Sequence, residues 1–497
     1  MASSISSVNP NISSSIFYIN DVHGQLPRME QLTSASVQFD SFVKEKKIDA
    51  LKLSSGDIFI GGNEKTNSVT AEFLNTTGIQ ASTIGNHEFD LTIPLLKKVI
   101  GQSKKTTYLG MNMNIPENSP LKNSVYRSTV ITENGNKYGI IGIQPQHIAD
   151  RLKNAEEILG GISIDDSRQT HKELQEEVDK LRAQGINKII LLSHSGYPEE
   201  KEIARTISGI DVILGGHSHD LIEGIKEGHN LFYSPEGSPV IITQAGRDGN
   251  HFGILNLEYN SDGVIVKAQN KVEKTMNYPK SLLMKIMGDK VLGPSPVVGQ
   301  LKHSDPSPEN LLTGENPHIN FFNDAVRKET DSDIVLFNSA GIRGTLPNGS
   351  LTERDIVSIF PFKNHLVKVH LSERDLIDVL NVGGKSLTSP DHKPGILQVS
   401  GLTYKMNKEG KVIEANFIDK NNNIHKIDVN NPDPAKKYIA TYNNFLFEGK
   451  DGMPMLNRED SVIEKYKIDT GDCGIQYIKK LNNQPFEIRK DGRIQIV

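Results

Sequence analysis

Short apolar runs alternate with amphipathic stretches along the first half of the chain. Runs that read as β-strands lie at residues 15–20, 50–54, 81–84, 107–111 and 139–144. Between them, residues 70–75 and 92–102 carry apolar side chains three and four positions apart, which is the spacing of an amphipathic helix. A longer polar helix is predicted over 166–184 and a second helix near 200–208, with strands at 188–193, 212–215 and 239–246. Alternating strands and helices predict a layered α/β domain.

The pattern breaks near residue 293 and then resumes. A hairpin-like pair of strands at 252–259 and 264–270 precedes a predicted helix over 279–292, which Gly293, Pro294 and Pro296 end. Beyond the break, further helices and strands are predicted at 320–329, 333–338, 366–371, 373–382, 402–407, 412–417 and 438–445. We therefore predict a first domain over residues 15–275, a linker helix within 276–296 and a second α/β domain over 297–497.

Composition narrows the class of protein. The 497 residues are enough for two or three domains at ~150 residues each. An apolar share of 36% and a charged share of 24% are ordinary for a globular protein. The formal net charge is -5 and no long basic run is present, so binding of nucleic acid through its phosphates is not indicated.

Cysteine content and the N-terminus bear on location. Cys473 is the sole cysteine, so an internal disulfide is impossible and an inert thiol is expected there. The first 15 residues lack the basic and apolar regions of a secretory signal, and no apolar run reaches the ~18 residues of a membrane span. We expect a cytoplasmic protein with no membrane partner, a monomer or homodimer, and leave open that a leader was removed.

Five of the strand-like runs end in residues that bind metals. In each, an apolar run stops at a Gly, Ser or Asn, and a carboxylate, amide or imidazole follows at once. The donors are Asp21, His23, Asp57, Asn86, His194, His217 and His219. Ligands in open α/β sheets bind beyond the carboxyl ends of the strands, so these side chains are expected to converge. Mixed oxygen and nitrogen donors suit Mn²⁺, Zn²⁺, Fe or Co²⁺ better than Ca²⁺. A hydrolytic metal site is the leading hypothesis.

Each of these motifs is weak evidence for a metal site by itself, but together they are strong evidence. Asp21 and His23 share a side of an extended backbone, but a structural role is the commoner explanation of such a pair. Asp57 follows a glycine, and Gly-Asp is common in turns. The strongest local signal is Gly-Gly-His-Ser-His, because His217 and His219 stand one residue apart on a glycine turn and can reach different metals.

The order of the motifs, DxH, GD, GNHE, H and GHxH, resembles that of the calcineurin-like metallophosphoesterases. GNHEFD, together with motifs in the second half, narrows the resemblance to the 5′-nucleotidase family, and it covers nearly the whole chain from Ile16. The resemblance implies a mixed α/β fold: an N-terminal four-layer αββα sandwich, a linker helix and a C-terminal substrate-specificity domain. It also implies two divalent metal ions, Mn²⁺ or Zn²⁺ first, with Fe, Co²⁺ or Mg²⁺ as alternatives.

The resemblance also assigns roles to the donors. It implies that one ion is held by Asp21, His23, Asp57 and His219, and the second by Asp57, Asn86, His194 and His217, with Asp57 bridging. Two ions ~3.5–4 Å apart lower the pKa of a bound water toward ~7, so the implied attacking group is a metal-bound hydroxide.

His87 and Asp90 are implied to form a catalytic dyad. In the family, the histidine stabilises phosphate charge and assists the leaving oxygen, and the aspartate orients it. A carboxylate partner fixes the proton position of the imidazole and favours its cationic form. Asp90 also suits the N-cap of the helix that follows, and both roles can hold at once.

Three segments of the second domain resemble the family's nucleoside pocket. Asn338 and Arg343 match an amide and a guanidinium that contact substrate. Phe362, within Pro361-Phe362-Lys363-Asn364, and Phe445 match two rings that sandwich the base. Asp451 matches a carboxylate that accepts hydrogen bonds from ribose hydroxyls. Without these motifs, both phenylalanines would read as core residues at strand ends.

The chain departs from the family pattern in this domain. Ser339 and Ala340 replace two glycines, which restricts φ and alters the approach to phosphate. Lys450 stands where glycine is usual, and Leu312 stands where some relatives carry a phosphate-contacting arginine. These departures bear on nucleotide preference and activity level more than on the phosphatase chemistry.

Several functions remain to be compared. Hydrolysis of a nucleoside 5′-monophosphate to nucleoside and phosphate is expected first. The alternatives are a 2′,3′-cyclic nucleotide phosphodiesterase, a nucleotide-sugar or dinucleotide pyrophosphohydrolase, a phosphoesterase for another substrate, or a non-catalytic nucleotide-binding protein. We also expect the helix near 280–292 to act as a hinge between the domains.

Overall fold

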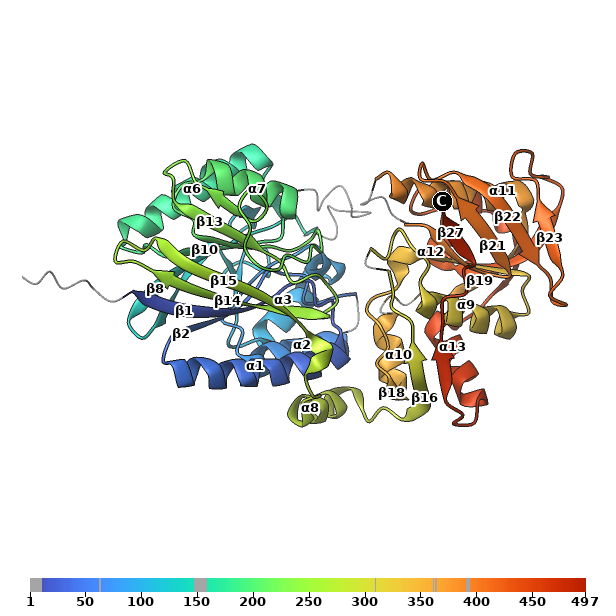
Figure 1. The fold of residues 1–497 in the computed structure, drawn as a ribbon, viewed down its shortest axis with the longest axis horizontal. Helices are drawn as coiled ribbons and strands as arrows, with labels where there is room; N and C mark the ends of the chain where they lie inside the picture. Colours follow the sequence, from blue (N-terminus) through green and yellow to red (C-terminus); the bar gives the residue numbers. More distant parts are fainter. Residues whose placement is uncertain are drawn as a thin grey trace, which may run out of the picture. The chain divides into compact units, whose positions relative to one another are not determined.

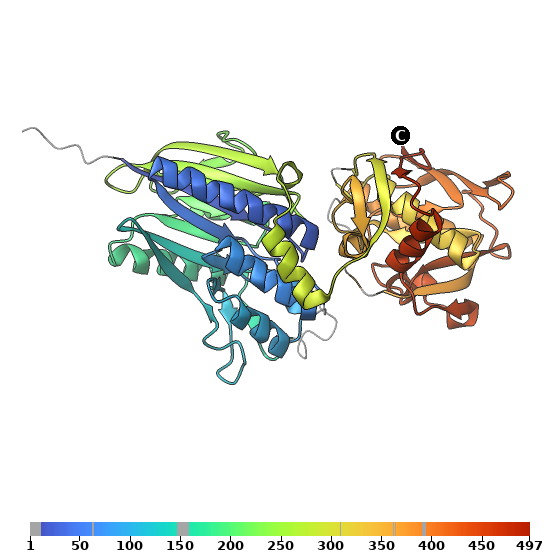
Figure 2. The same cartoon turned by 90° about the horizontal axis from the view of Figure 1, so that it is seen from below.

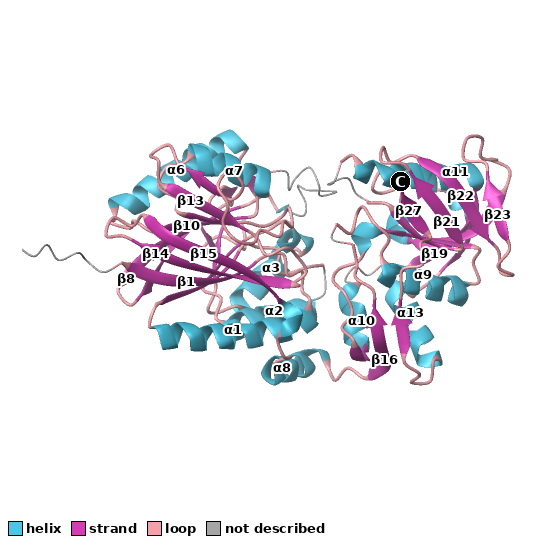
Figure 3. Cartoon of the chain, in the orientation of Figure 1, coloured by secondary structure: helices cyan, strands magenta, loops and turns pink. Residues whose placement is uncertain are grey.

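The computed structural model describes residues 11–61, 64–146, 159–308, 310–360, 362, 364–389 and 394–497. The chain divides into two compact units, Met1–Pro294 and Ser295–Val497 (Figure 1). Helices and strands are interleaved in both units (Figure 3), which confirms the predicted mixed α/β class. Pro361 and Lys363 of the predicted Pro-Phe-Lys-Asn element lie outside the described residues.

One sheet of the first unit has seven strands in the order β15-β14-β1-β2-β3-β4-β6. The strands are β1 (Ile12–Ile19), β2 (Asp49–Ser54), β3 (Ala81–Thr83), β4 (Thr107–Leu109), β6 (Val125–Tyr126), β14 (His251–Tyr259) and β15 (Ile265–Lys274). From β1 to β6 each strand is parallel to its neighbour, whereas β14 and β15 are antiparallel. The carboxyl ends of β1, β2 and β3 therefore meet at one edge of the sheet.

The other sheet has six strands in the order β12-β13-β11-β10-β8-β7. Its strands are β7 (Ser128–Glu133), β8 (Asn136–Ile143), β10 (Ile189–Ser193), β11 (Val212–Leu214), β12 (Leu231–Tyr233) and β13 (Pro239–Thr243). β8, β10, β11 and β13 are parallel, and an antiparallel strand closes each edge. A short pair, β5 (Met113–Asn114) and β9 (Ser163–Ile164), lies apart from both sheets.

The two sheets pack face to face between layers of helices. In β1 the side chains alternate, so Tyr18 joins Leu192 and Leu214 of the second sheet in one buried cluster, while Phe17 faces outward. Phe17 packs in the cluster formed with the helices α1 (Leu26–Lys46), α2 (Glu64–Thr77) and α3 (Ile93–Gln102). Helices α6 (Ser167–Ala183) and α7 (Tyr197–Thr206) cover the outer face of the second sheet. The predicted four-layer sandwich is confirmed.

Helix α1 occupies a segment for which the hydrophobic pattern predicts no helix. It runs for 21 residues and has a proline in its first turn. Its C-cap is Lys47, whose φ of 54° is left-handed. Its buried face mixes apolar residues such as Met29 and Leu32 with polar ones such as Arg28 and Gln31. Arg28 Nη1 donates to Gln31 Oε1 at 2.9 Å, so these polar groups are satisfied inside. The helical hydrophobic pattern is therefore diluted. Figure 2 shows this helix, in dark blue, lying along the strands.

The helix predicted before the chain break is α8 (Leu282–Leu292). Its N-cap Ser281 accepts a hydrogen bond from Met284 N, and Ser281 N donates to Glu30 O of α1 at 2.9 Å. The Met284 side chain is buried in the core of the first unit. Because α8 packs on α1 and α2, it belongs to the first unit. A hinge function for this helix stays a prediction.

The strands described in the second unit form three sheets. Their orders are β20-β17-β24-β19-β25, β23-β22-β21-β27 and β18-β16-β26. The strands are β16 (Val297–Ser304), β17 (Ile334–Asn338), β18 (Gly349–Thr352), β19 (Leu366–Ser372), β20 (Leu397–Ser400), β21 (Leu402–Met406), β22 (Val412–Ile418), β23 (Ile424–Ile427), β24 (Lys437–Asn443), β25 (Val462–Lys465), β26 (Phe486–Ile488) and β27 (Ile494–Ile496). The helices are α9 (Pro317–Thr330), α10 (Glu353–Ile359), α11 (Glu373–Gly384), α12 (Asn444–Phe447) and α13 (Thr470–Lys480).

Strands β17 and β24 are parallel neighbours in the five-stranded sheet. The turn after β17 and the short helix α12 after β24 therefore leave the sheet at the same edge. No helix in the described part of the chain is long and apolar enough to cross a membrane.

Candidate metal centre

The seven predicted donors follow strand ends in both sheets of the first unit. Asp21 and His23 follow β1, Asp57 follows β2, Asn86 follows β3, His194 follows β10, and His217 and His219 follow β11. Since these strands are parallel within each sheet, their carboxyl ends bring the donors to one edge of the sandwich. The structure places all of them near one another there.

Four donors form a buried floor. Asp21, His23, Asp57 and His194 are each at most 1% exposed. His194 Nε2 lies 3.0 Å from Asp57 Oδ2 and 3.8 Å from Asp21 Oδ1. His23 Nε2 lies 3.5 Å from Asp57 Oδ2 and 3.9 Å from Asp21 Oδ1. Two imidazoles thus face the same two carboxylates.

The remaining donors line the more exposed side. His219 Nε2 lies 3.3 Å from Asp21 Oδ1, and the His219 side chain is 28% exposed. His217 Nδ1 lies 2.7 Å from Asn86 Oδ1, and its ring centroid is 5.3 Å from that of His194. The amide N–H of His217 donates to Asp21 Oδ2 at 3.1 Å, which ties the glycine-rich turn to the floor.

His87 and Asp90 lie beside this cluster. His87 Nδ1 is 2.6 Å from Asp90 Oδ2, and the His87 ring centroid is 5.0 Å from that of His23. The amide of His87 donates to Asp57 Oδ1 at 2.8 Å, so the dyad is fixed to the floor through its backbone. The N-cap of α3 is Thr92, so the capping role considered for Asp90 is wrong; Asp90 ends the short 3₁₀ turn His87–Asp90.

The donor set fits divalent metal ions. His23 Nε2 and His194 Nε2 are buried and have no hydrogen-bond partner among the described residues, although each faces a carboxylate. Donors ~2.1 Å from a metal stand about 3.0–3.4 Å apart in octahedral or tetrahedral geometry, close to several spacings here. Three overlapping donor triplets have their ligand atoms within 4.8 Å of one another: Asp21, His23, His219; His23, Asp57, His87; and Asp21, Asp57, His194. The division of the donors between two ions stays a prediction.

Five of the donor residues have left-handed backbone conformations. The φ angles are 50° at Asp21, 51° at His23, 51° at Asp57, 73° at His217 and 63° at His219. Residues other than glycine rarely adopt such angles, and each instance costs on the order of 1–3 kcal/mol. Strained backbones that cluster at one site mark a functional rather than a packing constraint.

The carboxylates of the site attract positive charge. Burial disfavours ionised Asp21, yet His219 and His194 outweigh it and lower its pKa to about 2. Burial likewise opposes charge on His194, but Asp57 and Asp21 raise its pKa to about 10. For His219 burial prevails and lowers the pKa to about 4. A divalent cation between the carboxylates would meet the same demand for positive charge.

Glu88 holds the turn that carries Asp57. It is 1% exposed, and its two oxygens accept hydrogen bonds from the backbone N–H groups of Asp57, Ile58, Phe59 and Gly85 at 2.6–3.1 Å. Burial is the main reason that the pKa of Glu88 rises to about 7. Glu88 belongs to the GNHE motif, but the motif alone predicts no role for it.

Gln244 and Glu200 hold the Gly-Gly-His-Ser-His turn in the same way. Gln244 Nε2 donates to Glu200 Oε2 at 3.0 Å and to Gly216 O at 3.3 Å. Gln244 Oε1 accepts the amide of Asp220 at 3.0 Å. Gly216 has no room for a side chain, because a Cβ would lie 2.9 Å from His194 Nδ1. Glu200 lies in the first turn of α7, and nothing in the local sequence distinguishes it from a solvent-facing glutamate.

Asp248 is a further residue that the sequence motifs did not reveal. Its Oδ1 lies 3.0 Å from His23 Nδ1, and its side chain is fully buried. A signal existed, because Asp248 follows the end of β13 in Gln-Ala-Gly-Arg-Asp, the same pattern of strand, glycine and carboxylate that identified the other donors.

In the second unit, Asn338, Arg343 and Phe362 lie near the end of β17. Asn338 Oδ1 accepts a hydrogen bond from Asn443 Nδ2 at 3.0 Å, and the Arg343 guanidinium lies 5.2 Å from the Phe362 ring centroid. Arg343 Nη1 also donates to Ile342 O at 3.1 Å. A small hollow is lined by Phe337, Gly341, Phe360, Phe362, Asn364, Asn443, Asp469 and Thr470.

The Ser339-Ala340 departure is accommodated without backbone strain. These residues form a 3₁₀ turn, Ser339–Gly341, and neither has a positive φ. Ser339 Oγ donates to Ile396 O at 2.7 Å, and Ala340 N donates to Pro394 O. The expected restriction of φ therefore has no cost here. Leu312, the other departure nearby, uses its carbonyl to accept from Ile396 N at 2.8 Å.

Phe445 lies on α12, and Asp451 lies in the turn beyond it. Lys450 places its Nζ 5.2 Å from the Phe445 ring centroid and 2.7 Å from Glu448 Oε2. Asp451 has a left-handed φ of 56°. Phe445 is thus not a residue of a strand end, and a cation covers its ring. The base-binding roles of Phe362, Phe445 and Asp451 stay predictions.

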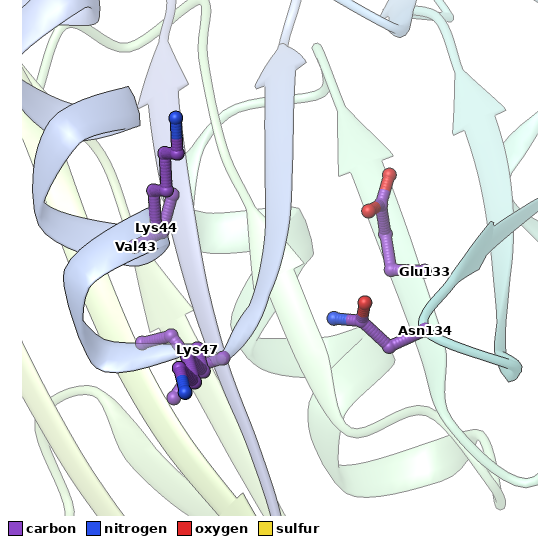
Figure 4. A pocket seen from close by; sticks show the side chains of 6 residues that line it. Val43, Lys44, Lys47, Glu133 and Asn134 are labelled. Atoms are coloured by element: carbon purple, nitrogen blue, oxygen red, sulfur yellow. The ribbon is translucent and has the colours of Figure 1, made fainter.

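One surface hollow of the first unit lies away from the metal donors. Val43, Lys44, Lys47, Ile48, Glu133 and Asn134 line it (Figure 4). Val43, Lys44 and Lys47 lie at the end of α1, and Ile48 directly precedes β2. Glu133 is the last residue of β7, and Asn134 follows it in the turn to β8. The hollow is therefore at the amino end of β2, whereas the donors gather at the carboxyl ends.

Comparison with known proteins agrees with this geometry. The family model for calcineurin-like phosphoesterase matches residues 14–221, and that for the 5'-nucleotidase C-terminal domain matches residues 297–458. Among curated proteins, the chain is 24% identical over 545 residues to the trifunctional nucleotide phosphoesterase protein YfkN of Bacillus subtilis (strain 168). That match covers 97% of this chain and 35% of the relative, so the chain spans about a third of that protein's length.

Two further comparisons cover nearly the full length of both chains. The chain is 26% identical over 492 residues to the 5'-nucleotidase-related protein of Glossina morsitans morsitans, covering 91% of this chain and 86% of the relative. The crystal structure of the 5'-nucleotidase precursor from Thermus thermophilus superposes with a TM-score of 0.74 at 22% identity, covering 98% of this chain and 99% of that one. The structural match shows a shared fold.

The sandwich, the donor cluster and the first family match define a calcineurin-like metallophosphoesterase, a class that uses a divalent metal pair. With the second match, which covers much of the C-terminal unit, the chain belongs to the 5′-nucleotidase family of metal-dependent phosphoester hydrolases.

Proposed function

We propose that the protein hydrolyses nucleoside 5′-monophosphates to nucleoside and phosphate with two divalent metal ions, Mn²⁺ or Zn²⁺ first. The observation that carries the proposal is the pair of buried imidazole nitrogens, His23 Nε2 and His194 Nε2, that lack hydrogen-bond partners among the described residues and face two buried carboxylates. Asp21, His23, Asp57, Asn86, His194, His217 and His219 would hold the ions. A bound pair supplies Lewis-acid stabilisation of the phosphoryl oxygens and activates water for in-line attack.

The chain's own acid–base group is His87. Asp90 accepts the Nδ1 proton of His87 at 2.6 Å, which leaves Nε2 to face the substrate. His87 is 15% exposed at its side chain, so a phosphoester oxygen at the metal edge can reach it. A protonated Nε2 would stabilise phosphate charge and give its proton to the departing ribose oxygen. Such proton transfer typically contributes ~10²–10⁴-fold to the rate.

Selection of the nucleotide is proposed to fall to the second unit. Arg343 and Asn338 would contact polar groups of the substrate, Phe362 and Phe445 would stack on the base, and Asp451 would accept hydrogen bonds from ribose. Stacking of a base on an aromatic ring is worth about 1–3 kcal/mol and tolerates different bases. The 26% identity with a relative named as 5'-nucleotidase-related supports this substrate class.

Phosphate release from a panel of nucleotides tests the proposal. With Mn²⁺ present, we expect release from AMP and related monophosphates, loss of release with EDTA, and a fall of ~10²–10⁴-fold in kcat for His87→Asn. His229→Asn is the matched control, because His229 is exposed and has no predicted role at the metal centre. Its ring lies 5.8 Å from that of Tyr197, and its carbonyl accepts from the Tyr197 hydroxyl. Release that survives both EDTA and His87→Asn would contradict the proposal.

A second substrate class has support of its own. The relative from Bacillus subtilis is named a trifunctional nucleotide phosphoesterase, and Lys450 covers the ring of Phe445 on which a base would stack. The same metal centre would then cleave 2′,3′-cyclic nucleotides, nucleotide sugars or dinucleotides. A rate on one of these at least tenfold above that on AMP would favour this alternative.

A further inference from the structure

Asp248 lies in the loop between β13 and β14, beyond the residues 14–221 matched by the metallophosphoesterase family model. Its side chain is fully buried, and its φ of 58° is left-handed. The Asp248 amide donates to the carbonyl of Asp21 at 2.6 Å, so this loop is tied directly to the segment that carries two predicted donors.

The two carboxylate oxygens of Asp248 face two different cationic or proton-bearing groups. Oδ1 lies 3.0 Å from His23 Nδ1, and Oδ2 lies 3.3 Å from Arg247 Nε. The Arg247 side chain is only 18% exposed, so its guanidinium acts on the carboxylate at short range with little screening by solvent. Arg247 therefore helps to orient the Asp248 carboxylate toward His23.

A carboxylate at Nδ1 decides which nitrogen of His23 carries the proton. A neutral imidazole has one N–H, and an ionised acceptor at 3.0 Å keeps that proton on Nδ1. Nε2 is left with its lone pair, and it is this atom that faces Asp57 at 3.5 Å without a hydrogen-bond partner among the described residues. Carboxylate partners of this kind raise the basicity of a ligating imidazole and fix its ring orientation.

The other buried imidazole has a different partner. His194 Nδ1 donates to the backbone carbonyl of Ser55 at 2.6 Å, which is a neutral acceptor. The two histidines of the floor thus present their Nε2 atoms to the same carboxylates, but only His23 has a charged group behind it. The centre is therefore asymmetric.

We propose that Asp248, supported by Arg247, is a positioning residue that fixes His23 as an Nε2 ligand and strengthens metal binding on the His23 side of the centre. The inference rests on the proposed function, since it requires that the donors bind metal. It adds a residue outside the matched family segment to the machinery of the site.

Metal binding by Asp248 variants tests the proposal. On full-length protein stripped with EDTA, Mn²⁺ dissociation constants are measured by competition with a fluorescent chelator. We expect wild-type protein to bind two ions. In Asp248→Ala, we expect the affinity for one ion to fall by ~10–100-fold while the affinity for the other changes little. Asp248→Asn should fall between, because an amide oxygen can accept the same proton without charge. Asp262→Asn, in the exposed turn between β14 and β15, is the matched control.

A second readout does not depend on metal or activity. In ¹⁵N spectra of stripped wild-type protein at a pH where the His23 ring is neutral, we expect His23 protonated at Nδ1, and we expect Asp248→Ala to give a mixture of tautomers. An unchanged His23 tautomer and an unchanged Mn²⁺ affinity in Asp248→Ala would overturn the proposal. It would also be overturned if the variant lost affinity equally for both ions and unfolded at a lower temperature. Wild-type protein that takes up no Mn²⁺ would overturn the proposed function as well, whereas normal uptake with unaffected variants would overturn this inference alone.

Discussion

The metal centre depends on glycines as much as on its donors. Asp57 has a left-handed φ of 51°, and its Oδ1 lies so close to Gly85 that a Cβ there would approach it to 2.2 Å. No real Cβ contact is that short, and Glu88 holds the backbone of both residues through hydrogen bonds. The Asp57 carboxylate can therefore hold its position only if residue 85 has no side chain.

Gly85→Ala should consequently displace Asp57. We expect loss of at least 100-fold in Mn²⁺ affinity and in phosphatase rate, because Asp57 faces both His23 and His194. Gly101→Ala is the matched control: this glycine lies in α3, and a Cβ there would meet nothing within 4 Å. The control should be stabilised by up to about 1 kcal/mol, since alanine favours a helix over glycine. Full activity of Gly85→Ala, measured with the same nucleotide panel, would contradict this expectation. It would show that the turn accommodates a Cβ at position 85 without displacing the Asp57 carboxylate.

The sequence predicts the donors of the site and misses what holds them. Asp57 and His194 are visible because a strand, a small residue and a donor follow one another in the chain. The left-handed backbone angles are invisible in such a pattern, because nothing in the residue type requires them. Glu200 is missed for another reason: its partner Gln244 is 44 residues away in sequence.

At the scale of single elements, a buried carboxyl group, that of Asp211, lies at the amino ends of β10 and β11, far from the metal donors at the carboxyl ends of these strands. Asp211 Oδ2 accepts the amide of Ile189 at 2.7 Å, and burial raises the pKa of Asp211 from its usual 3.8 to about 8 despite that bond and the nearby Lys188. The folded protein binds this proton more tightly than the unfolded chain does. Its contribution to stability is therefore fully present below pH ~4 and is lost as the pH rises toward 8.

Asp211→Asn should flatten that dependence. The amide oxygen of asparagine can still accept from Ile189 N, but it does not titrate. We expect the variant to gain stability relative to wild type as the pH rises from about 4 to 8, by roughly 1–5 kcal/mol at about 1.4 kcal/mol per pKa unit. Urea unfolding at several pH values measures it, with Asp262→Asn as the exposed control. A constant difference between variant and wild type across this range would rule out the proton linkage.

Helices differ in how well the sequence predicts them. α6 is predicted at 166–184 and observed at Ser167–Ala183, with Asp166 as an N-cap that accepts from Gln169 N at 2.8 Å. Its capping residue and its apolar spacing both point to the helix. α1 is missed because buried Arg28 and Gln31 interrupt the apolar stripe. Burial of polar side chains becomes understandable only when their partners are in place.

At the scale of the whole chain, the two units have separate hydrophobic cores. Leu32 and Leu192 lie in clusters of the first unit, whereas Leu336 and Ile356 lie in clusters of the second. The break at Gly293 and Pro294 in the sequence coincides with the division into Met1–Pro294 and Ser295–Val497. All seven predicted metal donors lie in the first unit, and the predicted base-binding residues lie in the second.

Metal should therefore stabilise one unit and not the other. We expect two thermal unfolding transitions, and saturating Mn²⁺ should raise the midpoint of only one of them by several degrees. An ion at a concentration 100 times its dissociation constant raises the free energy of unfolding of the unit that binds it by ~2.7 kcal/mol. Differential scanning calorimetry with and without EDTA measures the effect, and Asp57→Asn should abolish it. Equal shifts of both transitions would contradict the separation.

The left-handed donors have a consequence for engineering. Asp21, His217 and their neighbours hold conformations that glycine or asparagine adopts at lower cost, so substitution there relieves strain while deleting a ligand. Directed evolution that selects only for thermal stability, in buffer containing a chelator, will therefore enrich inactive variants with substitutions at these donor positions. A library screen for a hardier catalyst must score turnover in every round.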